Sequence, residues 1–151
     1  MLPDGPLHLD DFVPGDTLPL GTIGVDQEQI LAFGRAFDPL PFHTDLEAAA
    51  ESPFGGLIAS GWHTVSLLTR LWTDAVLGRT AAVGSPGVDE VRWLVPLRPG
   101  DTIDGSAEVL SVTASKSNAW RGTVVARIQG DNQHGERIAH FTAVSLIRRA
   151  G

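Results

Sequence analysis

The sequence contains no cysteine, and this absence removes several kinds of site at once. A chain without thiols has no disulfides, no thiolate ligands for metals and no cysteine nucleophile, and its redox compartment is left open. With 151 residues, the chain has the length of a single domain. A domain of this size buries roughly 70% of its unfolded surface. We therefore expect a hydrophobic core to hold the fold without further cross-links.

Positive charge is also scarce, since 11 lysine and arginine residues face 18 acidic ones and the formal net charge is −7. Proteins that bind nucleic acid normally carry a basic patch or stripe, so a nucleic-acid partner is not expected. Long apolar runs are missing as well, because no stretch approaches the roughly 18 residues of a membrane-spanning helix. The start, MLPDGPLHLDDF, lacks the basic and apolar regions of a secretory signal. We expect a cytoplasmic protein with no membrane partner.

Helices are predicted in the first half of the chain. Residues 1–16 are rich in Pro, Gly and Asp and indicate an N-terminal arm, followed by a first strand at about 17–25. Apolar residues at helical spacing, an N-cap and a proline stop predict a helix over about 26–38. In LIASGWHTVSLLTRLWTDAVLG (57–78), apolar residues recur every three or four positions, from Trp62 onward. This segment is predicted to be the main, largely covered helix of the domain.

A stiff loop separates these two helices. Pro39 and Pro41 fix their own φ angles and restrict the residues before them, so the loop is expected to be extended. Thr44 and Glu47 fit the capping-box pattern of a short further helix. His43 is therefore expected just outside a helix start.

The second half of the chain is rich in predicted strands. Four strand-like runs are separated by turn-forming residues: DEVRWLVPL (89–97), TIDGSAEVLSV (102–112), RGTVVARIQ (121–129) and RIAHFTAVSLI (137–147). They predict an antiparallel meander whose apolar face wraps around the long helix, which is a single α+β domain over residues 1–151. Exposed sheet edges in such a small fold often pair with a second copy, so a homodimer or larger homo-oligomer is expected.

Several common catalytic motifs are absent from the sequence. There is no G-x-x-x-x-G-K-[ST] phosphate loop, no G-x-G-x-x-G after a strand and no H-E-x-x-H. Ser60 lies in IASGW rather than G-x-S-x-G, so a helix N-cap is a better prediction for it than a nucleophile. His43 and Asp45 can supply two metal ligands, but no third ligand stands at a supporting spacing. We expect no metal site.

Asp38 and His43 form the clearest candidate for chemistry. Alone, Asp38 is best read as a turn residue and His43 as an ordinary residue before a helix. Together they place an acid and a base in one stiff loop flanked by Phe37, Leu40 and Phe42. Such a pair at the mouth of an apolar cavity is typical of general acid–base catalysis. His134 and His140, in a predicted turn and strand, are interpreted as structural or surface residues.

The start of the long helix is a second candidate element. Its unpaired N–H groups and positive dipole end can stabilise an oxyanion, and Gly61 has no Cβ to block a ligand. Taken by itself, the glycine is better explained by tight packing of the helix. The role of His63, near this helix start, stays open.

Together, these elements resemble the MaoC-like dehydratases. The segment FDPLPFHTDLEAAAESPFGGLIASGWH carries the resemblance: the D-x-N-P-[apolar]-H core of the family aligns with residues 38–43, and its I-A-[HS]-G element aligns with residues 58–61. VRWLVPLRPGDTI and the final strands are also similar to the family, so the resemblance covers most of the chain. The family includes R-specific enoyl-CoA hydratases and has the hot-dog fold, which the resemblance implies here.

The resemblance also implies a lyase reaction and its residues. Water would add reversibly and syn to a trans-2-enoyl-CoA, giving an (R)-3-hydroxyacyl-CoA. Asp38 and His43 would activate the water, and the Gly61 N–H would stabilise the thioester oxyanion, with Ser60 and Trp62 beside it in the substrate-binding site. No metal or redox cofactor is implied; coenzyme A or acyl carrier protein would carry the substrate.

Two departures from the family pattern leave alternatives open. Leu40 stands where the motif commonly has Asn, which removes a polar side chain from the loop, and Ser60 replaces a frequent histidine. Because hot-dog proteins also include thioesterases, an acyl-CoA thioesterase is an alternative. A further alternative is a non-catalytic subunit that binds acyl thioesters.

Overall fold

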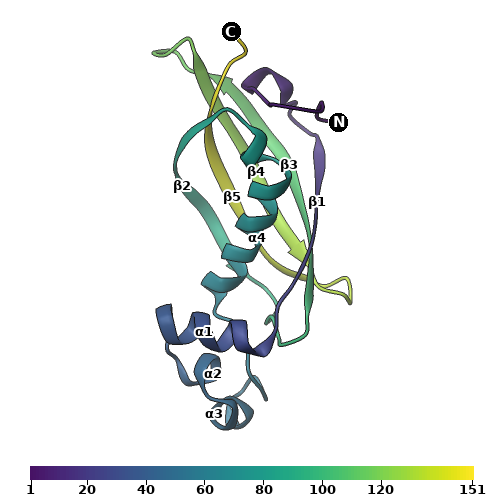
Figure 1. The fold of residues 1–151 in the computed structure, drawn as a ribbon, viewed down its shortest axis with the longest axis vertical. Helices are drawn as coiled ribbons and strands as arrows, with labels where there is room; N and C mark the ends of the chain where they lie inside the picture. The colour runs from purple at the N-terminus through teal and green to yellow at the C-terminus, as the bar shows by residue number, and fades with distance from the viewer.

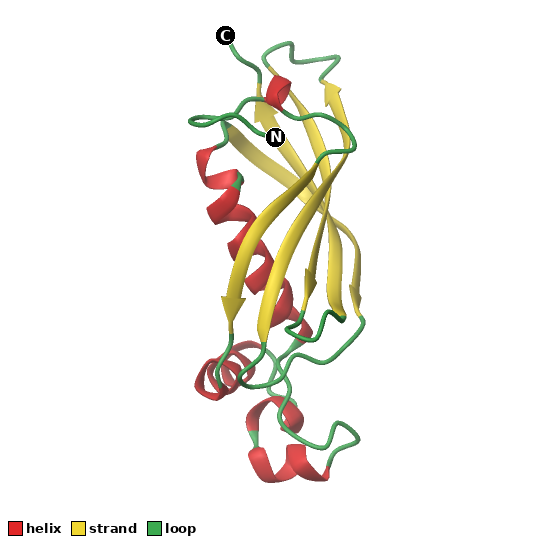
Figure 2. Cartoon of the chain, turned by 90° about the vertical axis from the view of Figure 1, so that its right-hand side faces the viewer, coloured by secondary structure: helices red, strands yellow, loops and turns green.

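The chain folds into a five-stranded antiparallel sheet with one long helix along it, in a computed structural model that describes residues 1–151. The spatial order of the strands is β1-β3-β4-β5-β2 (Figure 1). The long helix, α4 (Gly61–Ala75), lies beside the twisted strands (Figure 2), which confirms the predicted α+β class. The strands span Thr17–Gly24 (β1), Ala82–Trp93 (β2), Thr102–Ala114 (β3), Arg121–Asp131 (β4) and Arg137–Arg148 (β5).

The two central strands show why the sheet has one buried face. Along β4, every second residue is buried, and β3 alternates in the same way over most of its length. Side chains of a strand point to opposite faces with a period of two, so this alternation directs one set toward α4. The inward set comprises Ile103, Ala107 and Val109 on β3 and Val124, Ala126 and Ile128 on β4.

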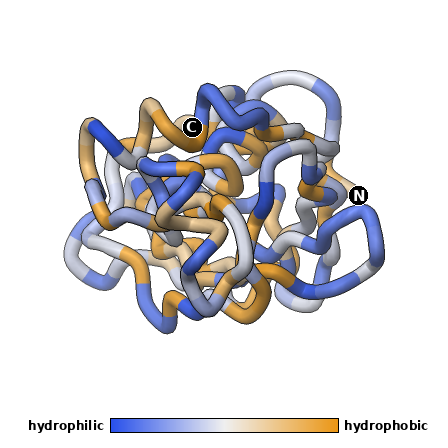
Figure 3. The backbone as a smooth tube through the Cα atoms, turned by 90° about the horizontal axis from the view of Figure 1, so that it is seen from below, coloured by the Kyte–Doolittle hydropathy of each residue, from blue (hydrophilic) through white to orange (hydrophobic).

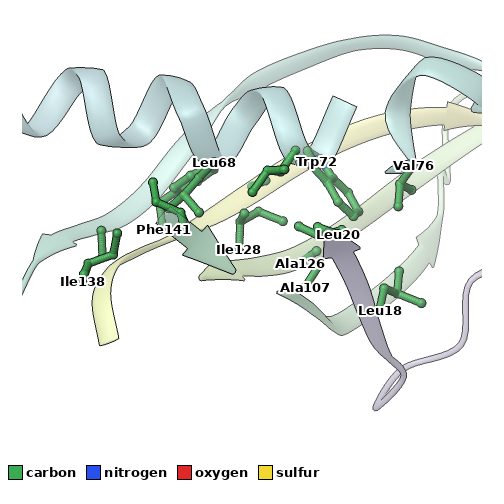
Figure 4. Packing of buried hydrophobic residues seen from close by; sticks show 14 of the residues in the cluster. Leu18, Leu20, Leu68, Trp72, Val76, Ala107, Ala126, Ile128, Ile138 and Phe141 are labelled. Atoms are coloured by element: carbon green, nitrogen blue, oxygen red, sulfur yellow. The ribbon is translucent and has the colours of Figure 1, made fainter. Parts of the chain in front are cut away.

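Helix α4 supplies the other half of the core. Its side chains Leu68, Leu71 and Trp72 are buried, and Figure 4 shows Leu68 and Trp72 among the core side chains of the sheet. Burying each large side chain contributes about 1.5–3 kcal/mol of hydrophobic stabilisation. Trp62, expected on the covered stripe, is instead 55% exposed, because the first turn of α4 borders a cavity rather than the sheet.

Three short α-helices precede α4 in the chain. They lie at one end of the sheet (Figure 1). Helix α1 (Gln27–Phe37) begins as expected, since the Asp26 carboxylate accepts from the Gln29 amide at 2.8 Å and the Gln29 side chain accepts from the Asp26 amide at 2.9 Å. The helix ends before Asp38, as the following proline predicts. None of the helices is both long and apolar enough to cross a membrane.

The loop after α1 differs from its expected form. Residues Pro41–Thr44 make one helical turn (α2), so His43 lies inside a helix rather than outside one. Pro41 occupies the first position of this turn, where its missing N–H costs nothing. Asp45, not Thr44, caps the next helix, α3 (Leu46–Glu51), because the Thr44 hydroxyl donates back to the Leu40 carbonyl.

The meander prediction is right for β3, β4 and β5 but wrong for β2. That strand pairs with β5, with Ala82 opposite Ile147 and Trp93 opposite Ala139, so it forms an edge of the sheet. It also starts and ends earlier than expected. The amides of the next two residues, 94 and 95, both donate to the Ile138 carbonyl, which ends the ladder.

The N-terminal arm packs against the domain. Leu7, Leu9 and Phe12 are buried, and the Leu7 amide donates to the Arg79 carbonyl at 2.8 Å. The arm contains a single 3₁₀ turn, Leu9–Asp11, and another, Leu77–Arg79, follows α4. Seen from below, hydrophilic segments form much of the outer loops while hydrophobic segments recur toward the middle (Figure 3). The arm therefore contributes three side chains to the core, while most of its other residues are exposed.

We expect Gly105→Ala to destabilise the fold. A Cβ at this β3 position would lie 2.7 Å from Leu71 Cδ1 and 3.3 Å from Leu20 Cβ, between α4 and β1. Overpacking of this kind typically costs about 1–3 kcal/mol. Urea denaturation measures the change in the free energy of unfolding. Gly24→Ala is the matched control, because its nearest atoms would be 3.9 Å away. Equal stability of the two variants would contradict the packing described here.

Candidate active site

Four segments meet at the end of the sheet where the short helices lie (Figure 1). Asp38 directly follows α1, His43 lies in α2, residues 57–60 lead into α4, and residues 93–97 leave β2. Two backbone hydrogen bonds join these segments: the Ile58 amide donates to the Phe42 carbonyl, and the amide of residue 59 donates to the carbonyl of residue 97. The candidate site is therefore built from pieces far apart in the sequence but locked by the main chain.

The structure brings Asp38 and His43 together. Oδ2 of Asp38 lies 3.4 Å from Nε2 of His43, and the His43 side chain is 6% exposed against 27% for Asp38. On its other side, His43 Nδ1 lies 2.7 Å from the Ile58 carbonyl oxygen. A carbonyl only accepts, so Nδ1 carries a proton and donates to Ile58, while Nε2 is the ring nitrogen that faces Asp38.

Ser60 has two partners, of which only one was expected. Its Oγ accepts from the Trp62 amide at 3.3 Å, which confirms the predicted N-cap of α4. The same hydroxyl donates to Asp38 Oδ2 at 2.7 Å. Because Ser60 is fully buried, this bond fixes the carboxylate at a set distance from the helix start.

Asp38 and His43 face one shared cavity of about 390 Å³. Gly61 and Trp62 also line it. The volume lies within the usual range for small-molecule sites. Most of the lining is apolar, and the remaining residues are Phe54, Ile58, Ala59, Thr64, Trp93, Leu94, Val95, Pro96 and Leu97.

Asp38 and His43, called the dyad from here on, have apolar neighbours in the sequence that lie elsewhere than expected. Phe37, Leu40 and Phe42 do not line the cavity. Phe37 and Leu40 are 76% and 47% exposed, because they lie on the outer side of α1 and of the turn. Phe42 packs edge-on against the His43 ring, with ring centroids 4.6 Å apart. The apolar wall comes instead from residues 93–97, whose strand-like pattern gave no sign of this role.

Gly61 begins α4, and its lack of a Cβ is explained by close packing, the simpler of the two explanations considered for it. It is the first residue of α4, and its amide donates to no group within the chain. A Cβ at this position would lie 2.5 Å from Nε1 and 2.8 Å from Cδ2 of the Trp93 indole, so close packing requires glycine here. The amide is thus free for a ligand.

Gly34 was missed by the sequence reasoning. A Cβ at this position in α1 would lie 2.7 Å from the His43 carbonyl oxygen and 3.0 Å from the His43 Cβ. The glycine therefore lets α1 approach α2 and sets the position of the histidine. A glycine inside a predicted helix often has a packing reason, and that signal was present in the sequence.

Comparison with known proteins decides the family. A model of the MaoC like domain matches residues 12–130. The chain belongs to the MaoC-like domain family. The resemblance of residues 37–63 to this family is thereby confirmed, and the sheet with its long helix is the hot-dog fold that the resemblance implied.

Individual relatives of this MaoC-like domain agree with the assignment. A crystal structure of a MaoC-like dehydratase from Rhodospirillum rubrum shares 39% sequence identity, with a TM-score of 0.89 over 96% of this chain and 99% of that chain. The R-hydratase PhaJ1 from Pseudomonas aeruginosa shares the fold, with a TM-score of 0.73 at 20% identity over 96% and 88% of the two chains.

A curated relative adds a named activity. The 3-hydroxyacyl-thioester dehydratase Z of Mycobacterium tuberculosis is 29% identical over 83% of this chain and 83% of its own length. Other curated relatives are longer, and the chain spans 28% and 20% of the length of two of them.

The remaining histidines of this MaoC-like domain lie outside the cavity lining. His63 stacks on Phe33, with ring centroids 4.7 Å apart, and its Nδ1 has no hydrogen-bond partner. His134 lies in the turn between β4 and β5, and His140 lies within β5, as predicted. No group of three or more His, Asp or Glu side chains is placed to hold a metal ion.

Burial of His63 predicts a pH dependence of stability. Desolvation lowers the pKa of His63 below its ordinary value of 6.5, so the folded protein resists protonation while the unfolded chain binds a proton. The unfolded state then carries more protons, and the free energy of unfolding falls as the pH drops below about 6.5. Urea denaturation between pH 7.5 and 5.5 measures this loss.

His63→Leu should reduce the loss of stability toward low pH. Some pH dependence of the stability will remain, because the pKa of His140 is also lowered, mainly by burial. Parallel curves for wild type and variant over this range would contradict the assignment to His63.

Proposed function

We propose that this MaoC-like domain catalyses the reversible addition of water to a trans-2-enoyl thioester, giving a 3-hydroxyacyl thioester of R configuration. The main observation is that Asp38 and His43 face one cavity with their acceptor atoms 3.4 Å apart. The names of the dehydratase Z and R-hydratase relatives support the same reaction. Coenzyme A or acyl carrier protein would carry the acyl group, in the cytoplasm.

The dyad is suited to holding a water molecule. His43 Nδ1 is occupied by the Ile58 carbonyl, so a neutral ring and an ionised Asp38 both present acceptors to the cavity. A water molecule can donate one hydrogen to each, which directs its oxygen lone pair toward the substrate. Ser60 holds the carboxylate in place by its 2.7 Å hydrogen bond.

The proton balance of the reaction closes within this site. As the water oxygen bonds to C3 of the enoyl group, the dyad takes one of its protons, and the π electrons move toward C2 and the thioester oxygen. The dyad then delivers that proton to C2 and returns to its starting state. Hydroxyl and proton come from the same side, so the addition is syn. Because water and substrate supply every atom, the scheme calls for no redox cofactor or metal.

The start of α4 can stabilise the charge that develops on the thioester oxygen. The free Gly61 amide lies at the positive end of the 15-residue helix dipole, beside the dyad. A hydrogen-bond donor placed at a developing oxyanion is typically worth about 10²–10³ in rate. Gly61 therefore acts as the oxyanion donor, and Trp62 lines the substrate side of the same turn.

Leu40, at the position where the family commonly has Asn, does not weigh against this function. Its side chain is exposed and does not line the cavity. The turn is closed by the main chain, since the Leu40 amide donates to the Asp38 carbonyl at 2.8 Å. The loop thus keeps its geometry without a polar side chain at this position.

Asp38→Asn should abolish most of the activity while leaving the fold intact. Asn keeps the shape of the side chain but cannot take a proton, so we expect kcat to fall by about 10²–10⁴. The assay follows loss of the conjugated enoyl absorbance with short, medium and branched trans-2-enoyl-CoA thioesters, together with product identification. Asp74→Asn, which alters an exposed acid paired with Arg70 on α4, is the matched control.

The outcomes of this assay separate the alternatives. Full activity in the Asp38→Asn variant would refute the roles given to the dyad. Release of free thiol in place of a hydrated product would assign a thioesterase. Ligand-induced stabilisation without turnover, with coenzyme A and carrier-protein substrates alike, would assign a binding subunit.

We further propose that two copies pair through β2 to form a homodimer. All but one of the twelve residues of this edge strand are exposed, including Val83 and Val88. A long exposed edge with apolar side chains favours pairing with another strand. Pairing with an identical strand would use one surface twice about a two-fold axis.

Val88→Glu should shift the protein from dimer to monomer. The charge would be buried, or face its own copy, when two β2 strands pair, which is unfavourable. Light scattering after gel filtration measures the molar mass. It should be twice the 16.0 kDa of one chain for wild type and equal to that of one chain for the variant. Val13→Glu, at an exposed valine outside the sheet, is the control. A monomeric wild type would refute the proposal.

A further inference from the structure

The indole of Trp93 covers one side of the proposed oxyanion donor. Its five-membered ring occupies the place of a Cβ at Gly61. Such a Cβ would lie 2.5 Å from Nε1 and 2.8 Å from Cδ2 of the indole. Any larger residue at position 61 would collide with this ring. The contact therefore joins the start of α4 to the end of β2 at the cavity wall.

The position of Trp93 is set from the strand side as well. Trp93 is the last residue of β2 and pairs with Ala139 of β5. The two amides that follow it both donate to the Ile138 carbonyl, at 2.8 and 3.3 Å. The backbone of Trp93 is thus fixed to the sheet while its side chain, 47% exposed, lies along the cavity.

Trp62 supports the indole from a second direction. The two rings meet at 80° with their centroids 5.3 Å apart, which is the favoured edge-to-face arrangement. Both rings line the cavity that holds Asp38 and His43. The two tryptophans therefore form an aromatic corner beside Gly61.

We propose that Trp93 is the residue that determines which acyl groups the site accepts at C2, an inference that rests on the function proposed above. A thioester oxygen bound by the Gly61 amide lies about 2.9 Å from that nitrogen, and C1 and C2 follow within two bonds. The indole packs on the Cα next to this nitrogen. The wall nearest to C1 and C2 is then the Trp93 ring.

This wall favours substrates that are flat and unbranched at C2. A trans-2-enoyl thioester is planar from the carbonyl to C3, and an unbranched one turns only the hydrogen of C2, which lies in this plane, toward the indole. A methyl group on C2 would project from this chain toward the ring or force the carbonyl away from Gly61. Substituents beyond C3 are directed past the dyad and are less affected by the ring. Trp93 thus selects against 2-methyl-branched acyl groups.

The test compares two substrates that differ by one methyl group. We expect wild type to prefer trans-2-butenoyl-CoA over trans-2-methyl-2-butenoyl-CoA, measured as the ratio of their kcat/KM values. In Trp93→Ala, this ratio should fall by about 10- to 200-fold, which is the range of discrimination in kcat/KM that one methylene gives in an apolar pocket. Trp93→Phe retains a planar ring and should keep most of the preference.

Trp120→Ala is the matched control, because Trp120 is similarly exposed (46%) but lies near the C-terminal residues 148–151 and away from the cavity. It should leave the substrate ratio unchanged. Should Trp93→Ala fail to fold, as shown by its thermal melt, Trp93→Leu replaces it with a smaller reduction in volume.

Failure of this inference is distinguishable from failure of the proposed function. An unchanged substrate ratio in folded Trp93→Ala, with Asp38→Asn still inactive, would overturn the role of Trp93 and leave the hydratase function standing. Equal turnover of the two substrates by wild type would overturn it as well. Activity in Asp38→Asn would instead remove the reaction on which the inference rests.

Discussion

The hydroxyl of Ser60 is the point on which the geometry of the site depends. It donates to Asp38, which is 22 residues away in sequence, and accepts from the first turn of α4. The carboxylate, the histidine beside it and the free amide of Gly61 are thereby held in one frame. A buried hydroxyl with both roles filled loses hydrogen bonds in any other arrangement, so the frame is rigid. The fold serves this contact by bringing α4 and α1 to the same end of the sheet.

Features with a local cause were predictable from the sequence. Alternation, helical spacing and caps indicated β1, β3, β4 and β5 together with α1 and α4, because each depends on residues close in the chain. The pairing of Asp38 with His43 was also predictable, since only four residues lie between them and two of these are prolines. The family resemblance then supplied the hot-dog fold, which periodicity alone does not specify.

Features that depend on tertiary packing were not predictable in the same way. The helical turn at Pro41 replaces the extended form that the two prolines predicted, and contact with α1 accompanies the helical form. The pairing of β2 with β5 requires a connection across the sheet, and no local signal specifies it. The cavity wall of residues 93–97 has the composition of a strand, so only its departure from the sheet exposes its role.

The contact between Gly34 and His43 has a consequence for reading sequence variation in such proteins. Gly34 does not line the cavity, yet it fixes the distance at which α1 supports the histidine. Ranking positions by proximity to the substrate would treat it as tolerant, while its backbone contact allows no added carbon without movement. The constraint on evolutionary drift at this site therefore extends one layer behind the reacting groups, to a residue that must leave the volume of a side chain empty.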